Sequence, residues 1–310
     1  GPSQVDTWDY KPTLAKRDGQ TLEGFDRFTG FFANSVGGLM KSPFEFKQHG
    51  QCGKHISSIF PHLAMHADRM AFIHSGHTES NNHSPALFMM NCGLPRMGYP
   101  CVGSWVTYGL GSNSDSLPAF VVMSDPKGRG LPKGHAANWG AGFLPSVYQG
   151  THFRPTGDAI DNLYRPEEMN PDQQRRQLDL LRHLNQKHLD ANPYEEELAA
   201  RIESFELAYR MQVAAPEAFN IGLETKQTQE AYGLNRQESK DYGRQCLIAR
   251  RLIERGVRFV QIFSGNQHWD HHSGIVKSLP DVCRKTDKPA AALVMDLKRR
   301  GLLDTTLVHW

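Results

Sequence analysis

A helical pattern that runs directly into a buried strand is the feature that most constrains this chain. Residues 238–255 carry apolar side chains at helical spacing, Gly256 ends that pattern, and the β-branched, apolar run 257–263 predicts a strand. Apolar runs at 70–73 and 119–123 predict two further strands. Strands that alternate with helices predict an α/β fold, with a mostly parallel central sheet flanked by helices on both faces. In such sheets, ligands bind beyond the carboxyl ends of the strands.

The rest of the chain continues this alternation. Further helices are expected over residues 56–70, 84–91, 172–189, 194–214 and 288–300, and a final strand over 305–308. No internal repeat divides the 310 residues, of which 39% are hydrophobic, so we expect residues 1–310 to form a single domain. The sequence begins without an initiator Met and ends inside a strand-like run, which we interpret as a fragment truncated at the N-terminus and C-terminus.

Charge and hydropathy argue against two classes of partner. Lys and Arg number 35 against 33 Asp and Glu, and no basic run is long enough to follow a phosphate backbone, so nucleic acid is not expected. No stretch approaches the ~20 apolar residues of a membrane helix, so no membrane span is expected. The five cysteines form no close pair of the zinc or redox type, whereas several of the 15 histidines gather in two short polar segments.

The first polar segment, residues 264–272, begins where a predicted strand ends. Asp270 and His272 offer a carboxylate oxygen and an imidazole nitrogen within three residues, and His268 and His271 lie close by. These groups bind zinc and related divalent metals. A polar loop with solvated histidines is the alternative, but the density of ligating groups after a buried strand favours metal binding or catalysis.

The second polar segment, residues 74–85, also follows a predicted strand and leads into a predicted helix. The N-terminus of a helix attracts anions through its free N–H groups and its dipole. His83 stands at the start of this helix and could be a ligand, a nucleophile or a general acid–base. Asn82 or Ser84 could instead simply cap the helix.

Two weaker candidates lie elsewhere. Asp6 stands in a turn-rich opening segment, where an Asp more often serves backbone hydrogen bonds than catalysis. A group of aromatic residues among glycines could line a pocket, although such residues more often pack in a core. These residues are Trp105, Tyr108, Trp139, Phe143 and Tyr148.

Blocks of sequence spread in order over the whole chain form a specific pattern. They include Gly1–Asp9 with Lys11 and Pro12, Asn82–Ala86, Gly103–Gly111, Leu117–Phe120, Gly142–Thr151, Gly256–Phe263, Trp269–His272 and Leu302–Val308. Together these blocks resemble the family called domain of unknown function 1501. The resemblance covers essentially the whole chain.

That family is similar to the alkaline phosphatase and sulfatase superfamily. The resemblance implies a large α/β sandwich with metal ions at the carboxyl ends of its central strands. It assigns a divalent metal, whether zinc, calcium or manganese, to Asp6, Asp270 and His272. It also implies an exported protein of the periplasm or cell surface, in a family that is abundant in Planctomycetes.

The sequence departs from the sulfatase pattern at the nucleophile. That pattern places a Cys or Ser two residues before a Pro and four before an Arg. Here His83 takes the nucleophile position, Pro85 is kept, and Leu87 replaces the Arg. The usual formylglycine precursor is therefore missing.

Two hypotheses follow for the function. The first is a metal-dependent hydrolase of sulfate or phosphate esters, in which His83 is the nucleophile or acid–base, and His77, Asn82 and His271 contact the substrate. The alternative is a non-catalytic anion- or glycan-binding protein on a degenerate alkaline-phosphatase-like fold, which the altered nucleophile favours. Either hypothesis predicts a small molecule or a glycan ester as partner. A purely structural surface protein is a third possibility.

Overall fold

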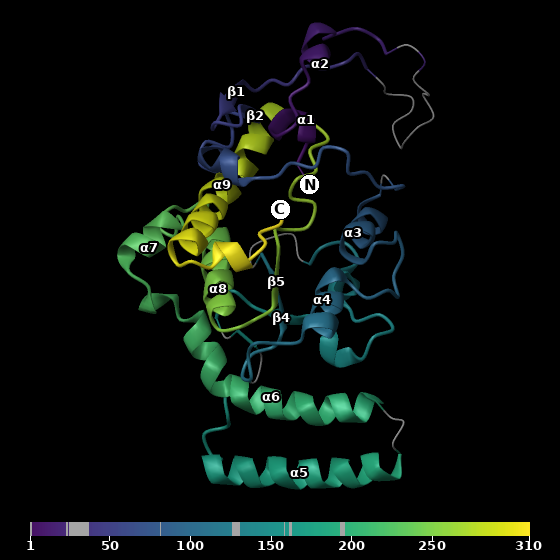
Figure 1. Ribbon diagram of the computed structural model, residues 1–310, viewed down its shortest axis with the longest axis vertical. Helices are drawn as coiled ribbons and strands as arrows, with labels where there is room; N and C mark the ends of the chain where they lie inside the picture. Colours follow the sequence, from purple (N-terminus) through teal and green to yellow (C-terminus); the bar gives the residue numbers. More distant parts are fainter. Residues whose placement is uncertain are drawn as a thin grey trace.

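The computed structural model describes residues 2–22, 24, 37–80, 82–125, 131–157, 159–160, 163–192 and 196–310 (Figure 1). Its helices are α1 (Gln4–Thr7), α2 (Pro12–Lys16), α3 (His83–Cys92), α4 (Val102–Leu110), α5 (Pro171–Ala191), α6 (Glu196–Phe219), α7 (Lys226–Ala231), α8 (Lys240–Glu254) and α9 (Ile275–Arg299). Its strands are β1 (Phe46–His49), β2 (Lys54–Ser57), β3 (Phe120–Ser124), β4 (Thr151–Phe153) and β5 (Phe259–Phe263). Short 3-10 helices include η2 (Leu63–Arg69), η3 (His135–Trp139) and η6 (Leu303–Thr305).

A three-stranded parallel sheet in the order β4-β3-β5 confirms the predicted mixture of helices and parallel strands. Residues 120–124 of β3 pair in register with residues 259–263 of β5, and residues 121–123 pair with β4 on the other side. The strands predicted over 119–123 and 257–263 are therefore confirmed. The sequence did not indicate β4, because a strand of three residues is too short to show an alternating pattern.

Side chains from β3 are buried on both faces of this sheet. Val121 and Met123 pack into a hydrophobic cluster with buried residues of α6 and α8. Phe120 and Val122, which alternate with them, pack with Trp139 of η3, and α4 contacts the sheet as well. A strand that is buried on two faces is apolar at every position, which is why β3 stands out in the sequence.

The segment before α3 differs from the prediction. Residues 56–70 are not one helix, because β2 pairs antiparallel with β1 and is followed by η2. The predicted strand over 70–73 is also wrong, since these residues pair with no strand in the described part of the chain. Ile73 is 86% exposed, so this apolar run lacks the covering neighbours of a buried strand.

The C-terminal third contains the predicted helices with altered limits. α5, α6 and α8 match the helices expected over 172–189, 194–214 and 238–255, with Tyr194 outside the described residues. α9 begins well before residue 288 and contains Pro280 and Pro289. The predicted strand over 305–308 is wrong, because η6 and irregular chain occupy this end of the described residues.

Helices α5 and α6 lie side by side at one end of the molecule (Figure 1). Arg175 of α5 lies 2.7 Å from Glu206 of α6, and its guanidinium also lies over the Tyr209 ring. Neither helix is apolar over its length. Across all described residues, the structure contains no helix that combines the length and the apolar character needed to cross a membrane.

A buried ion-pair network joins α8 to α9. The Arg250 guanidinium is 1% exposed and lies 2.7 Å from Glu224, 2.6 Å from Glu254 and 3.1 Å from Asp296. The contact with Glu254 is also a well-aligned hydrogen bond. The Tyr232 hydroxyl donates to Asp296 at 3.0 Å. The same three carboxylates also lie near Arg300, at 2.7–3.8 Å, so Arg250 is the buried cation of a shared network.

Arg250→Met should lower the free energy of unfolding by about 3 kcal/mol, because it removes the buried cation of the network and leaves the three carboxylates to the more exposed Arg300 and, for Glu224, also to Arg251. Urea denaturation measures this change. The matched control is Arg182→Met, which removes a half-exposed guanidinium 2.7 Å from Glu206 and should cost at most about 1 kcal/mol. Equal losses in the two variants would show that the Arg250 network does not hold α9 in place.

Candidate functional site

His83 is the first residue of α3, and its neighbours show how the helix begins. The Asn82 side chain accepts a hydrogen bond from the Ser84 N–H at 3.3 Å, so the capping role considered for Asn82 is present. Pro85 has no N–H, and the Ala86 N–H bonds to the Asn82 carbonyl at 3.0 Å. Within the described residues, the first turn of α3 therefore has no row of free N–H groups for an anion. An anion would be attracted by the helix dipole and by the His83 side chain.

The loop after β5 turns sharply and carries Asp270 toward α3. Gln267 has a left-handed backbone with φ of 53°, and its carbonyl accepts from the Asp270 N–H at 3.1 Å. The Trp269 indole N–H donates to the Ser264 hydroxyl at 3.1 Å, which ties the loop to the end of the strand. These local bonds fix the direction in which Asp270 projects.

Asp270 joins two histidines that the sequence analysis selected. Its Oδ2 lies 2.9 Å from His83 Nε2 and 2.9 Å from His272 Nε2. His83 and Asp270 are 187 residues apart in the sequence, so this contact depends on the tertiary fold. The side chains are 45% exposed at His83, 26% at Asp270 and 63% at His272, which leaves the group open to a ligand.

The two histidines change the titration of Asp270. Partial burial alone would raise the pKa of its carboxyl group, but the hydrogen bonds and positive charge of His272 and His83 outweigh that effect. The net result is a lowered pKa. Asp270 is therefore an ionised hydrogen-bond acceptor at neutral pH, as needed to orient an imidazole or to bind a cation.

A chain of side-chain amides holds α3 beside β5. The Gln261 amide donates to Asn91 of α3 at 2.9 Å, and the buried Asn91 amide donates to Asn138 of η3 at 3.0 Å. The sequence analysis missed these positioning residues. The available signal was Gln261 itself, a polar side chain inside the apolar run of β5.

Asp6 is buried next to the aromatic cluster that supports the loop. Its side chain accepts from the Ser3 hydroxyl at 2.6 Å, while its Oδ1 is buried with no hydrogen-bond partner among the described residues. Trp8 and Trp269 pack against the same hydrophobic cluster, and both contact the Trp310 ring. The segments that carry Asp6 and Asp270 therefore share one packing unit.

The predicted metal ligands are brought together only in part. Asp270 and His272 are in contact, but no hydrogen bond or ion pair of the described residues joins Asp6 to either. In the same residues, no group of three or more His, Cys, Asp or Glu side chains could hold a metal ion. The donor types suit a divalent metal, whereas the arrangement is not a closed coordination shell.

The remaining predicted residues lie around this group. His77 is exposed in the irregular segment before α3. His271, which stands between Asp270 and His272 in the sequence, is half-buried. The structure records no hydrogen bond for either side chain among the residues it describes. Of the aromatic group, Trp139 is buried against the sheet, while Trp105, Tyr108 and Phe143 are 46–65% exposed.

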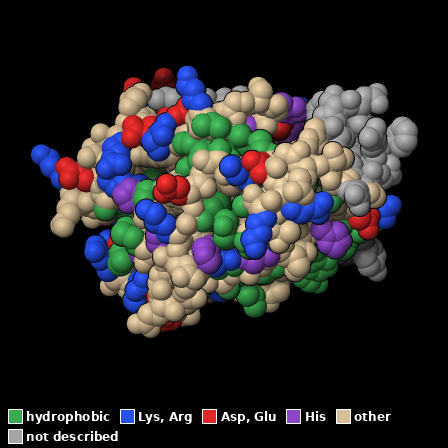
Figure 2. All heavy atoms as spheres, turned by 90° about the horizontal axis from the view of Figure 1, so that it is seen from above, with side chains coloured by type: hydrophobic (Ala, Val, Ile, Leu, Met, Phe, Trp, Pro, Cys, Tyr) green, Lys and Arg blue, Asp and Glu red, His purple; other side chains and the backbone are tan. Residues whose placement is uncertain are grey.

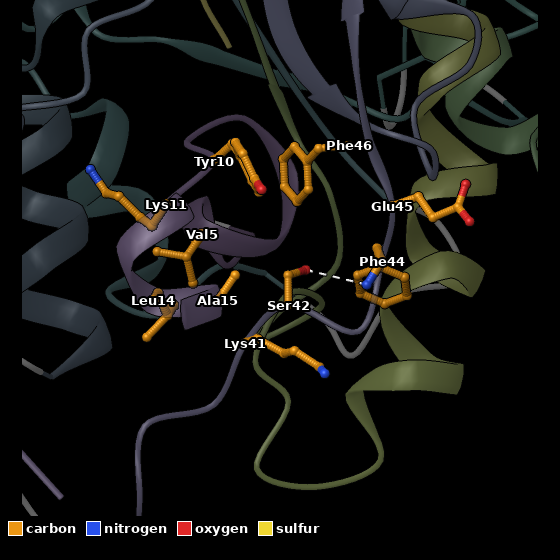
Figure 3. Close-up of a pocket in the computed structure, with 10 residues that line it drawn as sticks. All are labelled: Val5, Tyr10, Lys11, Leu14, Ala15, Lys41, Ser42, Phe44, Glu45 and Phe46. Atoms are coloured by element: carbon orange, nitrogen blue, oxygen red, sulfur yellow. Dashed lines mark hydrogen bonds between the residues drawn. The ribbon is translucent and has the colours of Figure 1, made fainter. Parts of the chain in front are cut away.

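A cavity of about 300 Å³ lies at the end of the molecule that carries α1, α2 and β1 (Figure 3). Figure 2 views this end and shows hydrophobic side chains near its centre among Lys, Arg and His side chains. Two lysines line the cavity, but Lys11 lies 2.8 Å from Asp9 and Lys41 lies 3.6 Å from Asp18. The cavity contains none of the predicted site residues.

Comparison with known proteins assigns a family. Residues 1–310 match the family described as Protein of unknown function (DUF1501). The chain belongs to the DUF1501 family. No curated protein and no solved structure matches the chain. The family resemblance seen in the sequence blocks is thus confirmed over the whole chain.

The lowered pKa of Asp270 predicts a pH-dependent contribution to stability. Because the folded pKa is lower than the unfolded value of about 3.9, the ionised carboxylate stabilises the fold above that pH. This contribution is lost as the pH falls through the folded pKa. With EDTA present, wild-type protein should therefore lose more stability than Asp270→Asn between pH 6 and pH 3, by up to about 1 kcal/mol.

Urea denaturation at each pH provides this measurement. Asp281→Asn is the control, because it removes a 49%-exposed carboxylate and leaves the contacts of Asp270 intact. This control should keep the acid sensitivity of the wild type. Identical pH profiles for wild type and Asp270→Asn would mean that the two histidines do not stabilise the carboxylate.

Proposed function

We propose that this DUF1501 protein is a metal-dependent hydrolase of sulfate or phosphate esters, built on an alkaline-phosphatase-like sandwich. One observation carries the proposal: Asp270 lies between His83 and His272, 2.9 Å from each, on the loop that leaves the carboxyl end of β5. Ligands of parallel sheets bind at that edge. An imidazole with a fixed carboxylate partner is a common acid–base unit of hydrolases.

His83 acts as the proton-transfer group or the nucleophile in this proposal. Its Nε2 faces Asp270, which leaves Nδ1 to take or give a proton. Asp270 fixes the orientation of the ring and stabilises its protonated form. The dipole of α3 favours a negatively charged sulfate or phosphate beside His83. His77, Asn82 and His271 are proposed to contact the substrate from the same side.

Asp270 and His272 are the proposed metal ligands, with Asp6 as the third. Their donors are two carboxylates and an imidazole, which suit zinc or manganese, and the unpartnered Oδ1 of Asp6 suits a cation. A bound divalent metal would supply Lewis-acid polarisation of the ester oxygen. The experiment below determines whether the metal is zinc, calcium or manganese.

A non-catalytic protein that binds an anion or a glycan is the second candidate. Two features of the sequence favour it: His83 stands at the nucleophile position of the sulfatase pattern, and Leu87 stands where that pattern has Arg. The same edge of the sheet would then bind the anion without turnover.

Export to the periplasm or cell surface is also proposed, and fractionation of producing cells tests it.

Asp270→Asn should lower kcat/KM for p-nitrophenyl sulfate or p-nitrophenyl phosphate by at least about 100-fold, because it removes the partner of His83. The assay contains zinc, calcium or manganese in turn. Asp281→Asn, a matched substitution in α9, should keep full activity. Metal content by mass spectrometry should be stoichiometric in the wild type and reduced in Asp270→Asn and His272→Ala.

Each result separates the candidates. Hydrolysis that survives Asp270→Asn would contradict the proposed mechanism. Saturable sulfate or phosphate binding without metal and without turnover would support the binding protein instead.

A further inference from the structure

A lysine at the start of β2 lies in contact with two side chains from the segment before α3. The Lys54 Nζ is hydrogen-bonded to Nε2 of His74 and lies 4.5 Å from the centre of the Phe72 ring. The Phe72 and His74 rings are stacked, with their centres 6.1 Å apart. Lys54 is half-buried and the His74 side chain is 35% exposed, so a small molecule can reach the amine.

A carboxylate lies on the other side of the imidazole. Asp9 Oδ1 is 3.7 Å from Nδ1 of His74, and the Asp9 side chain is 14% exposed. A carboxylate beside one ring nitrogen stabilises the protonated ring, so the other ring nitrogen becomes a better proton acceptor. Lys54, His74 and Asp9 therefore stand in the order of nucleophile, base and orienting carboxylate that activates nucleophiles in enzymes.

Local bonds fix the two ends of this line of three side chains. The turn before β2 is held by Asp68 of η2, whose carboxylate accepts the N–H groups of Gln51 and Cys52 at 2.9 Å and 2.8 Å. The Asp9 N–H donates to the Gln4 carbonyl at 2.8 Å, and Figure 1 shows α1 beside β2. The fold thus brings three segments of the chain to one place.

The groups around Lys54 make its amine easier to deprotonate than that of an ordinary lysine. Burial is the largest effect and lowers its pKa, and the charge of Lys11 acts in the same direction. The charges of Asp9 and Cys52 act in the opposite direction and do not outweigh burial. Asp9 also lies 2.8 Å from Lys11, which shares its charge. A lysine that is partly desolvated and near a second cation is suited to act as a nucleophile.

We propose that Lys54 is a nucleophile that forms an imine with a small aldehyde or ketone. His74 takes a proton from the Lys54 ammonium, and the amine nitrogen then bonds to the carbonyl carbon and passes one proton to the carbonyl oxygen. His74 returns its proton to that oxygen, the C–O bond breaks, and water leaves a protonated imine. One imidazole beside the amine serves as both base and acid. The reaction uses no residue of the group at Asp270, so it is independent of the proposed ester hydrolysis.

Reductive labelling with benzaldehyde and sodium cyanoborohydride at pH 7 tests the proposal. The reductant converts each imine to a stable amine, and peptide mass spectrometry locates the modified lysines. Lys47 of β1 is the internal control, because its side chain is 71% exposed and lies 3.9 Å from Glu45. Exposure alone would make Lys47 react faster. We expect Lys54 to react at least about tenfold faster than Lys47 in the wild type.

Two variants test the role of the imidazole, and circular dichroism checks that each is folded. His74→Gln should lower the rate at Lys54 at least about tenfold and leave the rate at Lys47 unchanged. His49→Gln is the matched control, because His49 pairs with Lys54 across β1 and β2 but its ring is not part of the line of three side chains. It should keep the rate at Lys54 within about twofold of the wild type.

Three results would overturn the proposal. The first is a wild-type protein in which Lys47 reacts as fast as Lys54, a comparison that needs no variant. The second is a His74→Gln variant that keeps the wild-type rate at Lys54. The third is an equal loss of that rate in His49→Gln and His74→Gln.

Discussion

Two attachments to β5, which pairs in parallel with β3, determine where the candidate catalytic side chains lie. Parallel strands end at the same edge of a sheet, so the loop after β5 begins beside the end of β3. The Asp125 N–H donates to the Phe263 carbonyl at 3.1 Å and extends this pairing to the last residue of β5. The amides of Gln261 and Asn91 then tie α3 to the same strand. His83 and Asp270 meet because both are anchored to β5.

Two electrostatic groups among the described residues have different consequences. Around Arg250, a 1%-exposed guanidinium neutralises several carboxylates and stabilises the fold. Removal of one partner would leave the other charges less well paired in a region that water reaches poorly. Around Asp270, the side chains are partly exposed and their bonds contribute little to stability. An accessible, modestly stabilised group of this kind is suited to binding a ligand rather than to holding the fold.

The elements that the sequence predicted best are those whose pattern is local. Residues 120–123 of β3 are all apolar because both faces of the strand are buried. Gly256 marks the point where α8 has ended and the run that forms β5 begins. The runs at 70–73 and 305–308 have the composition of strands but no partner strand, and pairing is a tertiary property that composition does not reveal. The early start of α9 was missed for a similar reason, since tertiary packing overrides local preferences around Pro280.

The candidate site, like the fold, was predicted only in part. His83, Asp270 and His272 were selected because polar segments follow strand-like runs, and the structure brings these three together. The position of Asp6 relative to them depends on aromatic packing around Trp8, which no spacing in the sequence encodes. Asn91 and its amide partners were missed because single polar residues in apolar elements have no periodic pattern.

A double-mutant cycle between His83 and Asp270 tests the central claim most directly. We would measure kcat/KM for the p-nitrophenyl ester that turns over faster, in wild type, His83→Gln, Asp270→Asn and the double variant. Residues that act as one unit lose nearly the same activity singly and together, so the double variant should be no worse than either single variant by more than a few-fold. Losses that multiply, or an activity that neither substitution changes, would contradict the account.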